Sequence, residues 1–196
     1  MGRPSNSRQK LLEVASTALW ESPTLAVSVD TLCKRAGINK GSFYYFFPSK
    51  TDLILHYLDD AWIRLRTNAL EPSFAPGIPP LERIDRYFRA ILVQQEEQLL
   101  ESGKVYGCPF VNVGQELATL EPRIRVFIQE IIERQIIYFQ SALFESQLNK
   151  NKLEDPNLIS HLIYNILHGA LGQSKIRQNL SPLASAREQI KIILVP

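Results

Sequence analysis

The 196-residue sequence has little of what builds covalently linked or membrane-embedded structures. Its two cysteines, Cys33 and Cys108, are too few for a disulfide framework and fit a reduced cytosol. It has no run of about 18 apolar residues, so we expect no membrane span. The opening stretch MGRPSNSRQK lacks an apolar segment and does not match a secretory signal. We therefore expect a cytoplasmic protein of one large or two small domains.

Motifs of common enzymes and cofactor sites are also absent. The sequence has no Gly-x-Ser-x-Gly, no dinucleotide-binding glycine fingerprint and no paired metal-ligand spacing. His161 and His168 lie seven residues apart without a third ligand nearby in sequence, so we interpret them as satisfied core or interface histidines. We expect no enzyme, no metal and no cofactor. A thiol-dependent enzyme built on Cys108 and a helical adaptor protein remain the alternatives.

Basic residues are concentrated near the N-terminus. Residues 1–50 contain seven basic and three acidic side chains, a net charge of +4, whereas the remaining residues carry −2. This asymmetry predicts a module that binds a polyanion, joined to a near-neutral body.

Apolar residues recur at helical spacing throughout, without strand alternation, so we predict an all-α fold. The stretch EPSFAPGIPP contains four prolines and predicts a linker without helix. We place a DNA-binding domain at residues 1–66 and a helical regulatory and dimerisation domain at residues 67–196. The expected helices cover about residues 11–19, 29–36, 40–47, 50–65, 81–100, 109–117, 122–148, 158–177 and 182–195.

The stretch GSFYYFFPSK contains five consecutive aromatic residues on an expected short helix. Helical spacing places Phe43 and Phe47 on the inner face and Tyr44 and Tyr45 outward. Ser28 can cap the preceding helix, Gly37 can end it, and Asn39 can cap the aromatic helix. Two short helices joined by a glycine turn predict a helix-turn-helix, with the tyrosines and nearby cations facing DNA. Alternatively, all five aromatics belong to the core.

The stretch SVDTLCKRAGINKGSFYYFFPSKTDL resembles the helix-turn-helix of TetR-family transcriptional regulators. The resemblance implies that Ser28, Tyr45 and Lys50 touch phosphates while Lys40, Ser42 and Tyr44 lie in the major groove, and we include Asn39 among the DNA-binding candidates. Phe46 departs from the family, which often has His or Tyr there. The resemblance also implies a homodimer on a palindromic operator in double-stranded DNA, formed through the last two helices, with Ile190, Ile193 and Leu194 on the shared face.

Two glycines in HGALGQSK cost a helix about 2 kcal/mol relative to alanine, which indicates close helix–helix approach in this stretch.

Two features of residues 67–196 could detect a signal. If Pro109 begins a helix, Cys108 is its N-cap, and the helix dipole would favour its thiolate. Cys108 could equally be a small buried hydrophobe. A second candidate is a hydrophobic ligand pocket, although each of its members could also be ordinary core. The pocket candidates are Phe88, Phe110, Phe127, Tyr138 and Tyr164.

The stretches GKVYGCPFVNVGQELATLEPRIR and LGQSKIRQNLSPLASAREQIKIILVP resemble the TetR repressors that respond to N-ethylmaleimide and hypochlorite. That resemblance implies that Cys108 is the sensor and that Lys175 pairs with its oxidised sulfur. The branch tends to carry more cysteines, and we interpret Cys33 as a packing residue. We therefore predict a dimeric repressor released from its operator by a small molecule or by electrophiles or oxidants that modify Cys108. A non-covalent hydrophobic inducer is the alternative.

Overall fold

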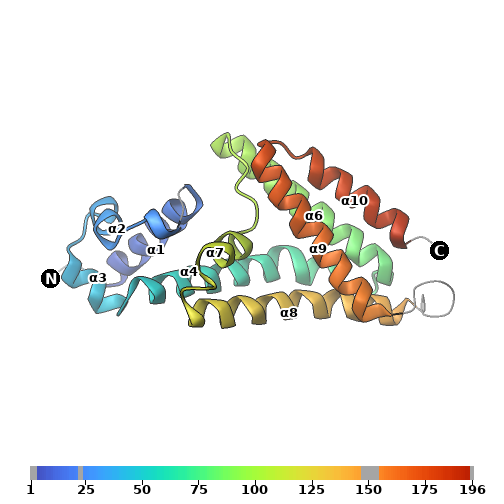
Figure 1. The fold of residues 1–196 in the computed structure, drawn as a ribbon, viewed down its shortest axis with the longest axis horizontal. Helices are drawn as coiled ribbons and strands as arrows, with labels where there is room; N and C mark the ends of the chain where they lie inside the picture. The colour runs from blue at the N-terminus through green and yellow to red at the C-terminus, as the bar shows by residue number, and fades with distance from the viewer. Residues whose placement is uncertain (1–3, 22–23, 147–154, 195–196) are drawn as a thin grey trace. The chain divides into compact units, whose positions relative to one another are not determined.

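The structure, a computed structural model, describes residues 4–21, 24–146 and 155–194. Within these ranges the chain forms helices and turns without strands, which confirms the predicted all-α fold (Figure 1). It divides into two compact units, one of Met1–Trp62 with Pro109–Gln129 and one of Ile63–Cys108 with Glu130–Pro196. The functional boundary after residue 66 stays a prediction. Among the described helices, none combines the length and apolar character needed to cross a membrane.

The first unit contains the predicted helix-turn-helix. Its core is apolar, and Leu11, Leu32, Phe43, Phe47 and Leu53 are fully or almost fully buried. Its short N-terminal helices pack on one another, and the α7 helix packs on the η1 turn. Its elements are α1 (Pro4–Glu21), η1 (Thr24–Ala26), α2 (Val29–Ala36), α3 (Lys40–Phe46) and α7 (Pro109–Leu117), with parts of α4 (Lys50–Leu65) and α8 (Pro122–Glu145).

The second unit is a helical bundle. Figure 1 shows α6, α9 and α10 side by side, and α10 packs on both others. Besides the remaining parts of α4 and α8, its elements are the π-helical turn η2 (Arg66–Leu70), α5 (Glu71–Ser73), α6 (Pro80–Ser102), α9 (Pro156–Arg177) and α10 (Ser181–Leu194).

The expected linker at residues 71–80 is partly wrong. The helical path of α4 continues through η2 and α5 as far as Ser73. Pro72 is tolerated because it occupies the start of α5, where a missing backbone N–H costs little. Non-helical chain is therefore confined to residues 74–79.

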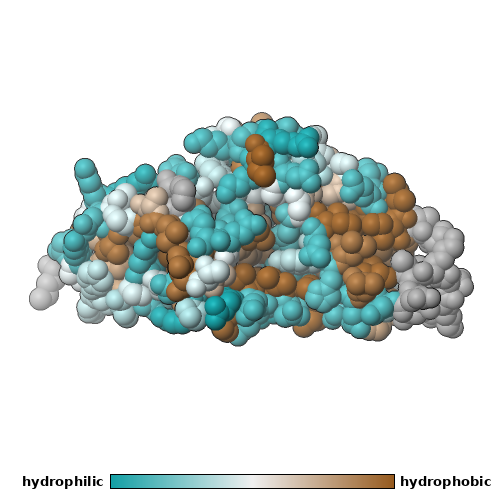
Figure 2. Space-filling model, viewed as in Figure 1, coloured by the Kyte–Doolittle hydropathy of each residue, from teal (hydrophilic) through white to brown (hydrophobic). Residues whose placement is uncertain are grey.

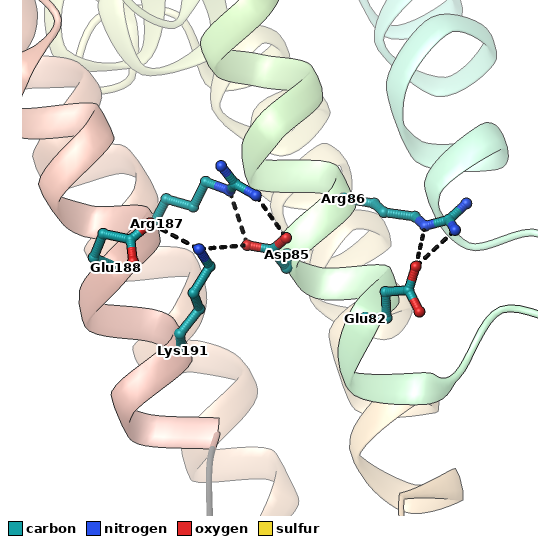
Figure 3. A network of polar contacts seen from close by, with 6 residues as sticks. All are labelled: Glu82, Asp85, Arg86, Arg187, Glu188 and Lys191. Carbon is teal, nitrogen blue, oxygen red and sulfur yellow. Dashed lines mark hydrogen bonds and ion pairs between the residues drawn. The ribbon is translucent and has the colours of Figure 1, made fainter.

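An ion-pair network joins α6 to α10 (Figure 3). The Arg187 guanidinium donates two hydrogen bonds of 2.8 Å to the carboxylate of Asp85, and this contact raises the pKa of Arg187. Lys191 Nζ lies 3.9 Å from Asp85 Oδ1 and 2.8 Å from Glu188 Oε1. This bidentate pairing fixes the orientation of α10 against α6.

The same face of α10 corrects an expectation about dimerisation. Ile190 and Leu194 are buried inside this chain, because they recur at helical spacing with Leu183 and Ala186. Ile192, in contrast, is exposed. Ile190 and Leu194 therefore belong to the core of the second unit and not to a face shared with another chain.

Candidate functional site

Local hydrogen bonds and one glycine define where α2 ends and α3 begins. Ser28 Oγ accepts a hydrogen bond of 3.1 Å from the Thr31 N–H, which caps α2. Gly37 ends α2 with φ 66°, a left-handed conformation that glycine adopts without strain. Asn39 Oδ1 accepts a hydrogen bond of 2.7 Å from the Ser42 N–H and caps α3. The predicted roles of Ser28, Gly37 and Asn39 at the helix ends are thereby confirmed, and the two helices form a helix-turn-helix.

The five aromatic residues divide between core and surface. Phe43 and Phe47 are fully buried, whereas 52% of Tyr44 and 78% of Tyr45 is exposed, as predicted. The guanidinium of Arg8 lies 5.5 Å from the ring centre of Phe47, a contact that no sequence pattern indicated. The interpretation in which all five aromatics are core is wrong, because two phenol rings face away from the unit.

The cations beside these tyrosines are not equivalent. Lys40 is exposed and forms an ion pair of 2.7 Å with Asp30, which raises the pKa of Lys40. Lys50 is half-buried, donates a hydrogen bond to the Thr24 carbonyl and has a pKa lowered by burial. A phosphate contact by Lys50 stays a prediction, and it would require this internal hydrogen bond to be exchanged.

The segment before α7 is clamped onto α9. Gln178 Oε1 accepts from the Val105 N–H at 3.1 Å, and Gln178 Nε2 donates to the Val105 carbonyl at 3.0 Å. Gly107 adopts φ 74°, and a Cβ added there would lie 3.5 Å from Lys175 Cβ. Lys175 therefore packs against the residue that precedes Cys108.

Cys108 lies directly before α7, whose first residue is Pro109 as predicted. Its side chain is only 9% exposed. Burial, and secondarily the Cys108 thiolate, raises the pKa values of Tyr87 and Tyr164. Both phenols therefore stay protonated, and they share the electrostatic environment of Cys108.

Several buried polar atoms of α6 and α9 have no hydrogen-bond partner among the described residues. They are Tyr164 Oη, both ring nitrogens of His168 and Gln95 Oε1. Gln95 Nε2 donates to the Gly107 carbonyl at 3.5 Å, and the Tyr164 and His168 rings lie 4.1 Å apart. Burial of both nitrogens lowers the pKa of His168 to about 3, although the residue as a whole is half-buried. His168 is therefore not satisfied by hydrogen bonds within this chain, and its interpretation as an interface histidine stays a prediction.

Family models match both parts of the chain. Residues 11–57 match the bacterial regulatory proteins of the tetR family, and residues 80–189 match the C-terminal domain of LmrA/YxaF-like transcriptional regulators. The chain belongs to the TetR family. It is thus a transcriptional regulator, as its helix-turn-helix indicates.

Similar TetR-family proteins come from several bacteria. The transcriptional repressor DhaR of Mycobacterium sp. (strain GP1) is 27% identical over 90% of this chain and 86% of its own length. The regulator AcuR of Cereibacter sphaeroides is 28% identical over 94% of this chain and 86% of its own length. The crystal structure of the reduced form of Escherichia coli NemR has a TM-score of 0.80 at 23% identity, covering 95% of each chain. These proteins are transcriptional regulators, and the NemR structure shares the TetR fold.

The aromatic residues predicted to line one ligand pocket do not all lie in the same unit of this TetR-family chain. Phe110 and the half-buried Phe127 belong to the first unit. Phe88, Tyr138 and Tyr164 belong to the second, where the Tyr138 ring lies 5.2 Å from that of Phe74. A pocket lined by all five stays a prediction.

Sequence reasoning missed residues that act through contacts distant in the chain. Asp30, Gln95 and Gln178 carry no motif, and their partners lie 10 to 73 residues away. Only the buried position of Gln95 on an amphipathic helix could have signalled an internal role. Within the described ranges, no group of three or more His, Cys, Asp or Glu side chains could hold a metal ion.

Proposed function

We propose that this TetR-family regulator represses transcription as a homodimer that inserts α3 into successive major grooves of a palindromic operator. The exposed tyrosine pair beside Lys40, on a helix capped by Asn39, carries this proposal. Lys40, Ser42 and Tyr44 would reach base edges, and Tyr45 would contact phosphate. Ser28, Asn39 and Lys50 would contribute to backbone contacts at the margins of the helix.

Open glycines on α9 support the homodimer. A Cβ added at Gly169 or Gly172 would meet no atom within 4 Å in this chain, so packing within the chain does not account for these glycines. Gly169 lines a groove of about 410 Å³ between α9 and α10. Figure 2 shows hydrophobic side chains gathered over the part of these two helices that lies near the C-terminus of the chain. The exposed apolar residues there include Leu158, Leu162 and Ile192. Close approach of the same helices from a second copy would use both features.

Modification of Cys108 is the proposed release signal. The Cys108 thiolate would attack one alkene carbon of N-ethylmaleimide and form a C–S bond. The C=C π-bond breaks in this step, and the other alkene carbon takes up a proton. The packed position of Gly107 against Lys175 supports the proposal, because a bulky adduct would not fit beside α9. Lys175 would lie close enough to interact with an oxidised sulfur. A non-covalent ligand that satisfies Tyr164 and His168 is the second candidate, favoured by their unpartnered polar atoms.

The first experiment is a gel-shift titration on DNA upstream of the protein's own gene. Tyr44→Ala should weaken specific binding by about tenfold, whereas Phe144→Ala, which removes an exposed aromatic on α8, should not change it. Equal affinities for both variants and wild type would contradict the assignment of α3.

The release mechanism is tested by the same titration with and without N-ethylmaleimide. The wild-type protein should lose the DNA on treatment, and Cys108→Ser should keep it. If both variants respond alike, Cys108 is not the sensor, and the unpartnered polar atoms around Tyr164 become the leading ligand site.

A further inference from the structure

A groove of about 470 Å³ lies on the second unit and is lined by two stretches of helix. The end of α4 and the η2 turn supply Arg64, Asn68 and Ala69. The facing side comes from one stripe of α6. This volume is within the range of pockets that hold small organic ligands.

The α6 stripe combines charge and apolar surface. Arg86, Arg89, Val93 and Glu97 recur at intervals of three or four residues, so they share one helix face. Ala90 lies between them and, with Val93, provides an apolar floor. The groove is therefore amphiphilic.

Three guanidinium groups concentrate positive charge along this groove. Arg64 and Arg89 are exposed, and Arg86 pairs with Glu82 at 2.6 Å (Figure 3). An exposed pair of this kind contributes little to stability, so a ligand oxyanion can replace it. Arginine binds carboxylates in a bidentate fork, which makes it the preferred residue for this group.

The η2 turn is a second, independent feature of the groove. A π-helical turn inside an α-helical path is rare and is frequently found at functional sites. Here it spans Arg66–Leu70 and includes Asn68, a groove residue. The Thr67 hydroxyl donates to the Ile63 carbonyl at 2.8 Å and supports the altered backbone.

We propose that this groove binds a small organic carboxylate, with its apolar body on Ala90 and Val93 and its carboxylate between the arginines. The acidic side chains of Glu97 and Glu82 lie at the groove or beside it and would repel a phosphate dianion more strongly than a carboxylate monoanion. The apolar floor likewise disfavours a nucleic-acid backbone. The proposal does not depend on operator binding or on Cys108.

Isothermal titration of the full-length protein with octanoate tests this site. Matched titrations use 1-octanol, which keeps the apolar body, and inorganic phosphate, which keeps only an oxyanion. Octanoate should bind the wild-type protein more tightly than either probe. Arg64→Gln and Arg89→Gln should each weaken octanoate binding by about tenfold, while Arg134→Gln on α8 should leave it unchanged.

Four results would overturn the proposal. The first is no heat of binding for octanoate at millimolar concentrations, and the second is equal affinity for 1-octanol. The third is unchanged octanoate affinity in an Arg64→Gln, Arg89→Gln double variant whose circular dichroism spectrum matches that of wild type. If the double variant instead loses only affinity for duplex DNA, with a shallower salt dependence, the groove binds DNA phosphates and the proposal is wrong.

Discussion

The clamp formed by Gln178 offers a direct way to test how tightly Cys108 is held. The Gln178 side-chain amide bonds both backbone groups of Val105 and also donates to the Lys175 carbonyl at 2.6 Å. Val105 is almost fully buried, so its N–H and carbonyl lose their partner in Gln178→Ala without ready access to water. We expect the segment before α7 to detach from α9 more often.

The size of this effect follows from the number of bonds lost. Two hydrogen bonds to Val105, each with a net value of about 1 kcal/mol, stabilise the closed segment by about 2 kcal/mol. Because 1.4 kcal/mol corresponds to a factor of ten, the open population should rise by about thirtyfold. Labelling of Cys108 that proceeds from the open state should accelerate by the same factor.

The assay is the rate of thiol labelling with an aromatic disulfide in a Cys33→Ala background, where Cys108 is the only cysteine. Gln129→Ala, at an exposed position of α8, is the matched control and should label at the wild-type rate. Gln178→Gly removes the same bonds but relieves the left-handed backbone at φ 51°, so it should label fast with a smaller loss of global stability. An acceleration below about threefold in both Gln178 variants would refute the reasoning.

Three further predictions concern the two units separately. Gly37→Ala and Gly103→Ala each place an alanine in left-handed backbone with open space around it, so each should lower the free energy of unfolding in urea by about 1–2 kcal/mol. Only Gly37→Ala should also weaken operator binding. Asp30→Asn releases Lys40 from its ion pair and should raise DNA affinity about two- to fivefold with a steeper salt dependence, and an unchanged salt slope would contradict this. Burial lowers the pKa of His168 in the folded state below its value in the unfolded state. Between these two pKa values the unfolded state binds more protons than the folded state, so acid favours unfolding. The free energy of unfolding should therefore fall by up to about 2 kcal/mol from pH 6.5 to pH 5. Urea unfolding at both pH values should show this loss reduced in His168→Gln but retained in His161→Gln, which alters an exposed histidine.

The helix-turn-helix could be predicted from sequence because its determinants are local. Ser28, Gly37 and Asn39 act within three or four residues of their own positions, and the spacing of Phe43 and Phe47 determines which face is buried. Such short-range signals depend on backbone geometry that is the same in every protein.

The second unit was harder to predict because its determinants are long-range. Asp85 and Arg187 are 102 residues apart in the sequence, and no pattern around either residue indicates that they form a pair. The π-helical turn has no sequence signature, and Pro72 suggested a break where the helical path continues. Ile190 and Leu194 were assigned wrongly to a shared face because two faces of α10 carry isoleucine, and only tertiary packing decides which is buried. The half-buried Ile193 stays a prediction for that face.

The π-helical turn also bears on how this chain tolerates changes in length. A π-helical turn contains about one more residue than an α-helical turn, so one residue of Arg66–Leu70 is geometrically surplus. Removing Asn68 would take out this surplus residue while both flanking segments keep their rotational phase. Deletions elsewhere in α4 would instead rotate all following side chains by about 100°. The helix that leads out of the DNA-binding unit thus contains one place where its length can change by a single residue without altering what lies on either side.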